Sequence, residues 1–527
     1  MTSLESKIGR MLAAGFDGLE APDYLLEWVR TGRIGTVILF ARNIESPEQV
    51  ARLTRSLHEA ALVSGDPLLI CVDQEGGTVA RMREAHGFTE SPGAMALGTA
   101  DDETLAENVS QVMARELRTV GVNWNLAPAI DVTHDIRNPT TGTRSLGTNP
   151  ARVSALAAAQ VRGFQRGGVL CSAKHFPGLG NTPTDTHYAL AVIDGSVDYL
   201  WEHDLIPFRA VIDGGIESIM MTHVQFTALD AQYPSTLSPA LIGGLLRDDL
   251  RFDGLVVTDC MEMKAVADLY DAGELAVLSA LAGIDVVLFS HTRTLQEAAF
   301  DGMLKAAREG RLPLAHIDDA NARVLALKTR YAIDPAALTL ENVRNVIRHP
   351  DHLAVMAQAA RAGCTLVRDD PALRPLPSGL RIGVVEFVPV YESAAQDGSG
   401  TAFGQFLAAQ RPQTAFLPLV AQHTDDAKRA HARAFAHDHD LIVIVTRNAH
   451  LSPVQAEIAL DLIGTASQSI AVCLRNPFDA DVLTGADAIL CTCGDSAPSL
   501  AAAVDALMGK FTPSGRLPVP LVTEFNL

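Results

Sequence analysis

The sequence lacks the features that mark membrane, secreted and nucleic-acid-binding proteins. No apolar run among its 527 residues reaches the roughly 18 residues that a helix needs to cross a bilayer. The N-terminal stretch MTSLESKIGRMLAAGFDG has no basic start followed by an apolar core, so it does not match a secretory signal. Basic residues are too few to balance the acidic ones, 42 against 62, and the formal charge of −20 disfavours contact with phosphate backbones. We therefore expect a cytoplasmic protein with no membrane partner and no nucleic-acid partner.

Cysteine is also scarce. The seven cysteines are an odd number and lie scattered through apolar runs such as LLICVDQ and AVCLRN. This distribution is unlike a disulfide framework and favours a reducing compartment. Cys491 and Cys493 are separated by a single residue and no second pair follows, whereas zinc and redox pairs use a wider spacing. The sequence therefore predicts no metal site.

What the sequence does contain is a long alternation of short apolar runs with helix-like segments. The chain exceeds the roughly 250–300 residues at which single cores stop growing, so two domains are expected. The apolar runs between residues 35 and 330 have the length of buried parallel strands and cover 36–40, 67–72, 122–127, 168–173, 217–222, 254–258 and 284–289. Between them, segments such as 151–165 place apolar residues at helical spacing. These repeated units predict an α/β fold with an N-terminal (β/α)₈ TIM-like barrel over residues 1–340.

The second half is predicted to be a smaller layered α/β sandwich domain at 364–527, reached through a helical connector at 341–363. Its candidate strands are 382–388, 441–446, 469–474 and 487–491. Helix-like segments alternate with them at 423–436, 453–464 and 497–509, which favours a mostly parallel sheet. The segment 390–402, VYESAAQDGSGTA, is predicted to be a polar loop.

Polar side chains recur where the predicted barrel strands end. Asp73, the pair Lys174 and His175, His223 and Asp259 each follow an apolar run. The carboxyl ends of barrel strands form the face on which barrel enzymes carry their active sites. We therefore expect these side chains to meet at one end of the barrel.

The most informative stretch is KHFPGLGNTPTDTH at 174–187. Its prolines and glycines cannot continue a strand or a helix, so it is predicted to be a long loop over the barrel mouth. On such a loop, Asp185 and His187 form a carboxylate-oriented imidazole that is suited to general acid/base catalysis. Taken alone, the Asp-x-His pattern is weak evidence, because incidental polar loops also contain it.

A second stretch, GLVVTDCMEMK at 254–264, ends its apolar strand on Asp259. A carboxylate there is expected to face the barrel mouth, and glycosidases use such a group to attack the anomeric carbon. The alternative is a helix N-cap, because Asp is favoured where a strand turns into a helix. Glu262 is the other candidate nucleophile, although we expect it to lie in the following helix, where it is less suitably aimed.

Two further stretches carry side chains that suit sugar hydroxyls. In VDQEGGTVARM at 72–82, Asp73 ends a strand, the glycine pair lets the backbone approach a ligand, and Arg81 follows. In NPTTGTRSLG at 138–147, Arg144 lies in a turn-rich loop. A single arginine in a loop is usually a solvated charge, so Arg144 alone does not indicate a binding site. It becomes a candidate only together with the other motifs.

Taken together, these motifs resemble glycoside hydrolase family 3 and, within it, the bacterial β-N-acetylglucosaminidases. The resemblance extends from IGRMLAAGFDG at 8–18 and RIGTVILFARNIESPEQV at 33–50 to GKFTPSGRLPVPL at 509–521. It implies that Asp259 is the nucleophile, that His187 is the acid/base and that Asp185 is the partner of His187. It also implies that the substrate is contacted by Asp73, Arg81, Arg144, Lys174 and His175.

The catalytic loop departs from the family pattern. Where the family usually has Pro-Gly-His-Gly-Asp, this chain has Leu179 and Asn181 in place of the histidine and the aspartate, and Thr186 replaces the common serine. The Asp185 and His187 pair is kept, so the departures bear on loop packing and on leaving-group preference.

The implied activity is retaining, exo-acting hydrolysis of terminal β-linked N-acetylglucosamine through a covalent glycosyl-enzyme, without a cofactor. The alternatives are a β-N-acetylglucosaminide phosphorylase, a β-glucosidase or β-xylosidase of the same family, and a catalytically silent sugar-binding protein. Family members of the β-glucosidase type take their acid/base glutamate from the second domain, where Glu386 and Glu392 are the candidates. The carbohydrate that carries the sugar stays open between a muropeptide fragment from cell-wall recycling, a chitin oligosaccharide and a glycoconjugate.

Overall fold

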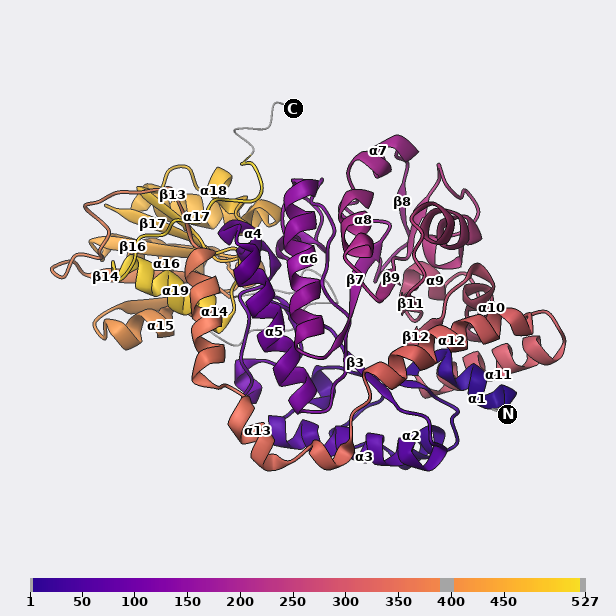
Figure 1. The fold of residues 1–527 in the computed structure, drawn as a ribbon. Helices are drawn as coiled ribbons and strands as arrows, with labels where there is room; N and C mark the ends of the chain where they lie inside the picture. The colour runs from indigo at the N-terminus through magenta and orange to yellow at the C-terminus, as the bar shows by residue number, and fades with distance from the viewer. Residues whose placement is uncertain (1–2, 389–401, 522–527) are drawn as a thin grey trace.

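The computed structural model describes residues 3–388 and 402–521. Within the first range, eight parallel strands close into a barrel in which each strand pairs with the next along the chain and β12 pairs with β1 (Figure 1). These strands are β1 (Leu12–Ala14), β2 (Thr36–Leu39), β3 (Leu69–Val72), β6 (Trp124–Asn125), β7 (Leu170–Phe176), β9 (Ser218–Met221), β11 (Leu255–Cys260) and β12 (Val286–Phe289). The predicted TIM-like barrel is confirmed.

The barrel strands coincide with apolar runs because both of their faces are buried. Ile38, Leu69, Trp124 and Leu255 belong to the cluster that fills the barrel interior. Alternate strand residues instead join the cluster that packs against the surrounding helices. Tyr331 belongs to the interior cluster, and its carbonyl accepts a hydrogen bond from the side chain of Asn123, just before β6. The chain therefore closes the barrel at the end where the strands begin.

An outer layer of helices surrounds the barrel (Figure 1). The helix α1 (Leu4–Arg10) precedes the first strand. The helices that follow it are α2 (Asp23–Arg30), α3 (Pro47–Ser64), α4 (Ala94–Ala100), α5 (Glu103–Thr119), α6 (Pro150–Arg166), α7 (Val197–Glu202), α8 (Leu205–Asp213), a π-helix (Ala240–Asp249), α9 (Lys264–Ala267), α10 (Ala272–Ala282), α11 (Arg293–Arg308) and α12 (Leu314–Arg330). In α6, predicted as 151–165, Asn149 caps the first turn and Val153, Leu156 and Phe164 are buried.

A second, six-stranded sheet lies within residues 365–491 and stands beside the barrel, next to α4 (Figure 1). Its order is β13-β18-β17-β16-β14-β15, and every neighbouring pair is parallel except β13 with β18. The strands are β13 (Thr365–Arg368), β14 (Ile382–Phe387), β15 (Ala415–Leu419), β16 (Leu441–Thr446), β17 (Ser469–Cys473) and β18 (Ala488–Cys491). The prediction of a layered, mostly parallel second sheet is thus confirmed.

Helices cover both faces of this sheet. Residues of α15 (Phe403–Gln410) and α19 (Ala497–Leu507) pack in one hydrophobic cluster, and those of α16 (Asp426–His437) and α17 (Pro453–Thr465) pack in another. A short helix α18 (Asp479–Val482) precedes β18. The helices α13 (Leu340–Val346) and α14 (Pro350–Ala362) occupy the segment predicted as a helical connector. The segment predicted as a polar loop, 390–402, lies outside the described residues except for residue 402.

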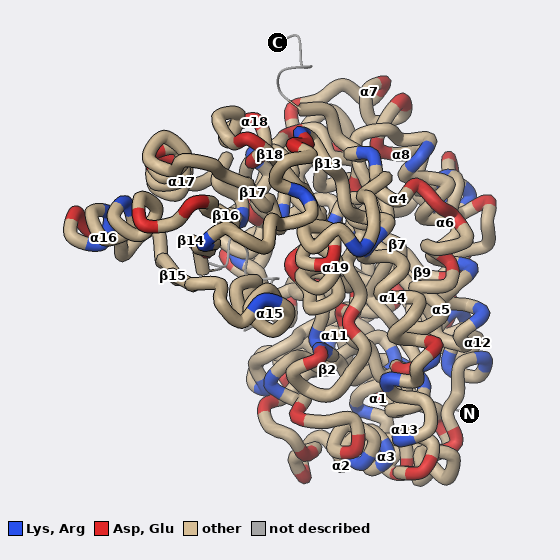
Figure 2. Tube along the Cα trace, turned by 90° about the vertical axis from the view of Figure 1, so that its left-hand side faces the viewer, with Lys and Arg blue, Asp and Glu red and all other residues tan. Residues whose placement is uncertain are grey.

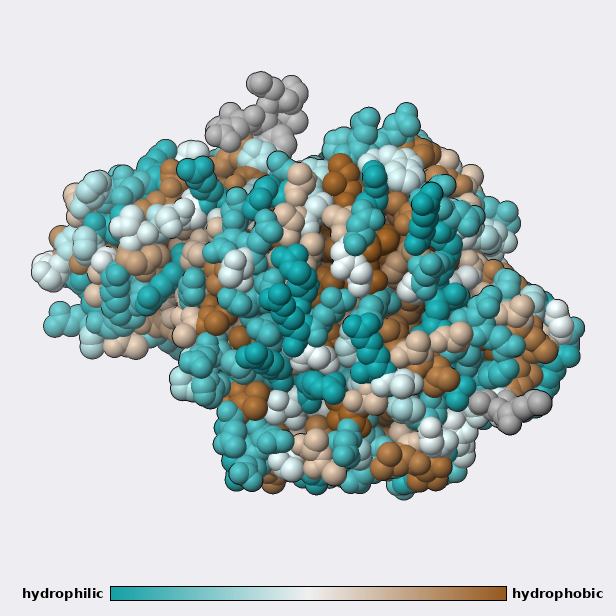
Figure 3. All heavy atoms as spheres, viewed as in Figure 1, coloured by the Kyte–Doolittle hydropathy of each residue, from teal (hydrophilic) through white to brown (hydrophobic). Residues whose placement is uncertain are grey.

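The surface is polar and mixed in charge. Acidic and basic residues are interspersed in Figure 2, without a large region of one sign in that view. Hydrophilic side chains cover most of the face shown in Figure 3, with hydrophobic ones scattered between them. Among the residues that the structure describes, no helix has both the length and the apolar composition needed to cross a bilayer.

Candidate active site

A cavity of about 420 Å³ opens at the end of the barrel where the strands terminate. This volume falls within the range of small-molecule binding sites. The cavity wall contains seven of the eight predicted site residues, namely Asp73, Arg81, Arg144, Lys174, His175, His187 and Asp259. The eighth, Asp185, contacts His187. Residues scattered over much of the barrel sequence are therefore brought to one place.

Asp259 lies at the end of β11 and faces the cavity. Its Oδ1 accepts a hydrogen bond from the backbone N of Cys260 at 2.7 Å. It does not cap a helix, because α9 begins only at Lys264. Burial acts to raise the pKa of the Asp259 carboxyl, but the nearby His223, His175, His187 and Lys174 outweigh it and hold this pKa below its usual value. The carboxylate is therefore ionised at neutral pH, as a nucleophile must be.

His187 and Asp185 form a close pair beside this carboxylate. The Nδ1 of His187 lies 2.7 Å from Asp185 Oδ1, which also accepts the backbone N–H of His187 at 2.9 Å. The side chain of Asp185 is only 6% exposed, whereas that of His187 is 23% exposed and lines the cavity. Asp185 therefore orients the ring through Nδ1, which leaves Nε2 to exchange a proton with a ligand.

The loop that carries this pair is tied to the barrel at several points. The backbone N of Leu179 donates to Asp131 Oδ1 at 2.8 Å, and Asn138 Nδ2 donates to the carbonyl of Leu179 at 2.8 Å. Further along, the backbone N of Lys264 donates to the carbonyl of His187 at 3.4 Å. Leu179 is buried in the cavity wall and Asn181 is exposed. The leucine thus places an apolar side chain where the family pattern has an imidazole, while the asparagine is not part of the cavity wall.

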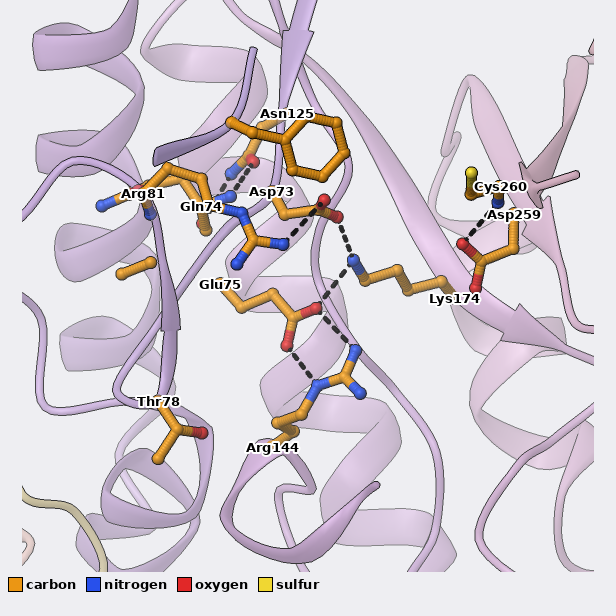
Figure 4. Close-up of polar contacts among 12 residues, drawn as sticks. Asp73, Gln74, Glu75, Thr78, Arg81, Asn125, Arg144, Lys174, Asp259 and Cys260 are labelled. Carbon is orange, nitrogen blue, oxygen red and sulfur yellow. Dashed lines mark hydrogen bonds and ion pairs between the residues drawn. The ribbon is translucent and has the colours of Figure 1, made fainter. Parts of the chain in front are cut away.

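A cluster of buried charges forms the opposite wall of the cavity (Figure 4). Lys174 Nζ lies between Asp73 Oδ1 and Glu75 Oε1, 2.7 Å from each. Arg144 makes a two-pronged contact with Glu75 through bonds of 2.8 Å, and Arg81 Nη2 lies 3.3 Å from Asp73 Oδ2. The cluster presents both donors and acceptors, which is what the hydroxyl groups of a sugar require.

The charges in this cluster hold one another in the ionised state. Burial alone would lower the pKa of Lys174, but the carboxylates of Asp73 and Glu75 raise it above its usual value. Burial would likewise raise the pKa values of Asp73 and Glu75, but the facing cations lower both. Because each ion depends on its partners, removal of one would leave an uncompensated buried charge.

His175 is held between a carboxylate and a guanidinium. Its Nδ1 lies 2.7 Å from Asp131 Oδ2, and its Nε2 lies 3.2 Å from Arg144 Nη2. A guanidinium can only donate and a carboxylate can only accept, so the tautomer with its proton on Nδ1 fits both contacts. His175 thus links Asp131 to Arg144 and helps to orient the guanidinium.

Glu75 and Asp131 were not predicted as site residues from the sequence. Both are buried counter-charges, Glu75 for Arg144 and Lys174, and Asp131 for His175. A signal for Glu75 was available, because it lies two residues after Asp73 and buried cations need acidic partners. Asp131 follows β6 through an irregular segment and carries no comparable pattern.

Two of the three glutamates considered from sequence bind backbone groups, and the third lies outside the described residues. Glu262 was expected in a helix, but it precedes α9, and its Oε1 accepts the backbone N–H groups of His291 and Thr292 at the start of α11. Glu386 is buried in the second domain, where it caps the first residues of α15 and pairs with Arg447. Glu392 lies outside the described residues.

His223 follows β9 as expected but serves a different role from the cavity residues. It is fully buried, and its Nε2 lies 2.9 Å from the carbonyl of Cys260, the residue after Asp259. Its Nδ1 lies 2.7 Å from Thr236 Oγ1. His223 therefore holds the end of β11 in place through the carbonyl of Cys260.

No group of three or more His, Cys, Asp or Glu side chains is arranged to hold a metal ion within residues 3–388 and 402–521. The seven cysteines, which all lie in the described part of the chain, are free.

Residues 3–327 match the glycosyl hydrolase family 3 N-terminal domain. The chain belongs to glycosyl hydrolase family 3. A beta-hexosaminidase A from Pseudoalteromonas piscicida is 32% identical to this family 3 chain over 374 residues, which make up 67% of the chain and 62% of that protein. A beta-hexosaminidase from Stenotrophomonas maltophilia strain R551-3 is 36% identical over 294 residues, or 55% of the chain and 85% of that protein. The chain thus spans less than two thirds of the first of these relatives.

A solved structure is similar over nearly the whole chain. It is a glycoside hydrolase family 3 beta-N-acetylglucosaminidase from Paenibacillus sp. str. FPU-7, with a TM-score of 0.92 and 34% identity. The similarity covers 99% of this chain and 99% of that one. The family 3 chain therefore shares its two-part architecture with this structure.

Proposed function

We propose that this protein is a retaining, exo-acting β-N-acetylglucosaminidase. The observation that carries the proposal is the meeting in one cavity of an ionised Asp259 with a His187 that is oriented by Asp185. The names of the similar proteins, beta-hexosaminidase and beta-N-acetylglucosaminidase, support the same substrate class.

In the first step, the charged imidazole of His187 gives its Nε2 proton to the glycosidic oxygen while Asp259 attacks the anomeric carbon. The bond between that carbon and the leaving oxygen breaks, and an ester to Asp259 forms. His187 is then neutral, with Nδ1–H still bound to Asp185. In the second step, Nε2 takes a proton from water, which displaces Asp259 and restores the original anomeric configuration.

The buried cluster is assigned to binding of the terminal sugar. Asp73 provides acceptors, Lys174, Arg81 and Arg144 provide donors, and His175 holds Arg144 in place. Because the cluster closes one side of the cavity, it suits removal of one sugar from a chain end. This residue-by-residue assignment is part of the proposal.

Phosphorolysis is the second candidate. A neutral His187 after the first step would tolerate a phosphate anion beside it better than a carboxylate would. Against it, the cations on which a phosphate would rely, Lys174 and Arg144, are already paired with Asp73 and Glu75. This pairing favours water as the acceptor.

The test is turnover of nitrophenyl β-N-acetylglucosaminide with and without millimolar phosphate, with the products analysed by mass. We expect free N-acetylglucosamine at a rate independent of phosphate. N-acetylglucosamine 1-phosphate would instead establish a phosphorylase, and preference for nitrophenyl β-glucoside or β-xyloside would establish the other family activities. Absence of turnover on all of these substrates would favour a sugar-binding protein.

We also propose a cytoplasmic location, which is supported by the seven free cysteines, since reducing compartments leave thiols unpaired. The candidate carriers of the terminal sugar are a muropeptide fragment from cell-wall recycling, a chitin oligosaccharide and a glycoconjugate.

A further inference from the structure

The loop that carries Arg144 lies between the barrel and the second domain. On the barrel side, Ser145 Oγ donates to the carbonyl of Asp131 at 2.7 Å, and Asn138 Nδ2 donates to the carbonyl of Leu179 at 2.8 Å. Asn138 Oδ1 in turn accepts the backbone N–H groups of the next turn, at Thr140 and Thr141. One side of the loop is therefore fixed by the barrel.

The other side of the loop is fixed by residues near the end of the chain. The backbone N and the Oγ1 of Thr148 both donate to the carbonyl of Pro518, at 3.0 and 3.3 Å. Gly147, with φ +142°, passes so close to Pro518 that a Cβ atom there would lie 2.6 Å from the same carbonyl oxygen. The segment around Pro518 thus has a contact role that its sequence did not suggest.

A second contact comes from Asn476, which follows β17. Its side-chain amide faces Gly142, where φ is +40° and a Cβ atom would lie 3.1 Å from Asn476 Nδ2. The amide is buried and locked, because Asn448 Oδ1 accepts both its backbone N–H and its Nδ2 at 3.0 Å. A rigid side chain of the second domain therefore abuts the turn that lies two residues before Arg144.

We propose that the second domain positions Arg144 for sugar binding, with Asn476 and the carbonyl of Pro518 as the positioning groups. The inference rests on the proposed function, in which Arg144 contacts the terminal sugar. The guanidinium must meet Glu75 through two bonds and His175 through a third, so a small displacement of its loop disrupts all three. Displacements of about 1 Å at such positioning residues are enough to impair an active site.

The same domain also contacts the segment that follows Arg81. The backbone N of Ala497, at the start of α19, donates to Glu90 Oε2 at 2.9 Å. Gly494 approaches the carbonyl of Pro92 so closely that a Cβ atom would lie 2.4 Å from its oxygen. The second domain thus contacts both the loop that carries Arg144 and the segment that follows Arg81. These contacts agree with a role of the domain in shaping the site.

The test is a double-mutant cycle between Asn476→Ala and Arg144→Ala, with kcat and KM measured on nitrophenyl β-N-acetylglucosaminide. Because ground-state binding is lost while the proton transfer is not, we expect Asn476→Ala to raise KM about fivefold and to change kcat less than about twofold. In the Arg144→Ala background, the same substitution should change KM less than about twofold, because its target is gone. Gln410→Ala, which removes an exposed amide on the same domain, is the matched control and should leave both constants unchanged.

Thermal unfolding of each variant checks that the fold is intact. If Asn476→Ala does not fold, Thr148→Val removes the side-chain bond to Pro518 without opening a cavity and should raise KM in the same way, by a smaller factor. An unchanged KM in the folded variant, or an equal rise in both backgrounds, overturns the inference while the proposed function stands. A KM that Arg144→Ala leaves unchanged overturns both the inference and the assignment of Arg144 to the sugar site.

Discussion

Asp259 and Glu262 lie close together in sequence but have different surroundings. Both line the cavity, but Oε1 of Glu262 accepts the backbone N–H groups of His291 and Thr292, whereas Asp259 lies beside His187 and, among the described residues, accepts only the backbone N–H of Cys260. We expect Asp259→Ala to lower kcat by about 10⁴-fold or more, since loss of a nucleophile removes the covalent route. A slow fluorinated glycosyl donor, digested and analysed by mass, should label Asp259.

Glu262→Gln is the comparison variant for this experiment. The amide keeps an oxygen for the backbone of α11, so turnover is expected to stay within about tenfold of the wild type. Label on Glu262, or on another carboxylate, would show that the nucleophile has been misassigned.

For His187, we expect the effect of substitution to depend on the leaving group. His187→Ala should lower kcat/KM about 10²-fold or more on substrates with basic leaving groups, and much less on activated nitrophenyl glycosides, because only a basic oxygen needs its proton. Asp185→Asn should act in the same direction but more weakly. Equal losses on both kinds of substrate would mean that His187 positions the sugar without transferring a proton.

The cavity residues could be predicted from the sequence, whereas their buried counter-charges could not. Seven of the eight predicted side chains line the cavity and the eighth contacts one of them, because residues at the carboxyl ends of barrel strands must meet. Glu75 and Asp131 were missed because their role is to pair with charges that are distant in sequence. The orientation of Glu262 depended on where a helix begins, and helix boundaries are the least reliable element of a sequence-based prediction.

At the scale of elements, the junction between β7 and the loop that carries His187 depends on Asp131. Its carboxylate accepts the Nδ1–H of His175, the backbone N of His175 and the backbone N of Leu179. Asp131→Ala leaves these donors buried without an acceptor. We expect it to cost about 3 kcal/mol or more of unfolding free energy, and most of the turnover.

Asp135→Ala is the matched control for this variant. Asp135 is close in sequence, but its side chain binds Arg137, which is largely exposed. Exposed ion pairs contribute about 1 kcal/mol or less, so this variant should remain close to the wild type in urea unfolding. If the two variants unfold alike, Asp131 is not the anchor of the loop.

Elements within long apolar runs were predicted well, and some short or edge strands were missed. β14, β16 and β17 were predicted to within a few residues, since five or six buried residues in a row are distinctive. β1 has only three residues, two of them alanines, and was missed although it completes the barrel. β13 and β15 lie at the edges of the second sheet and are partly exposed, so their apolar signal is weak. The domain boundaries at 340 and 363 stay predictions, although α13 and α14 occupy that segment.

At the scale of the whole molecule, the barrel could be predicted because the number of strand–helix units nearly determines its closure. The way in which the second domain meets the barrel could not be predicted. That contact depends on single groups such as Asn476 and the Pro518 carbonyl, which fit glycines in a loop far away in sequence. No periodic pattern encodes such a fit.

Stability of the whole fold should fall in mild acid, and His58 is expected to contribute. This residue of α3 is 3% exposed, and its Nε2 lies 2.9 Å from the carbonyl of Gly121. Burial lowers the pKa of His58 from 6.5 to about 4. Between these two pH values, His58 binds a proton in the unfolded chain but not in the folded protein. The contribution of His58 to stability is therefore fully present above pH 6.5 and is lost as the pH falls through 4.

The expected loss from His58 is on the order of 3 kcal/mol. His58→Gln retains a donor for Gly121 but cannot take up a proton, so its unfolding midpoint in urea should depend less on pH between 6.5 and 4 than that of the wild type. His437→Gln, which replaces an exposed imidazole on α16, should keep the wild-type dependence. The carboxyls of Asp73, Glu75 and Asp131 have lowered pKa values, so their stabilisation is lost only below their ordinary values of 3.8 to 4.5. A wild-type midpoint that is flat from pH 6.5 to 4, or a His58→Gln variant with the same slope as the wild type, would show that His58 is not a source of acid sensitivity.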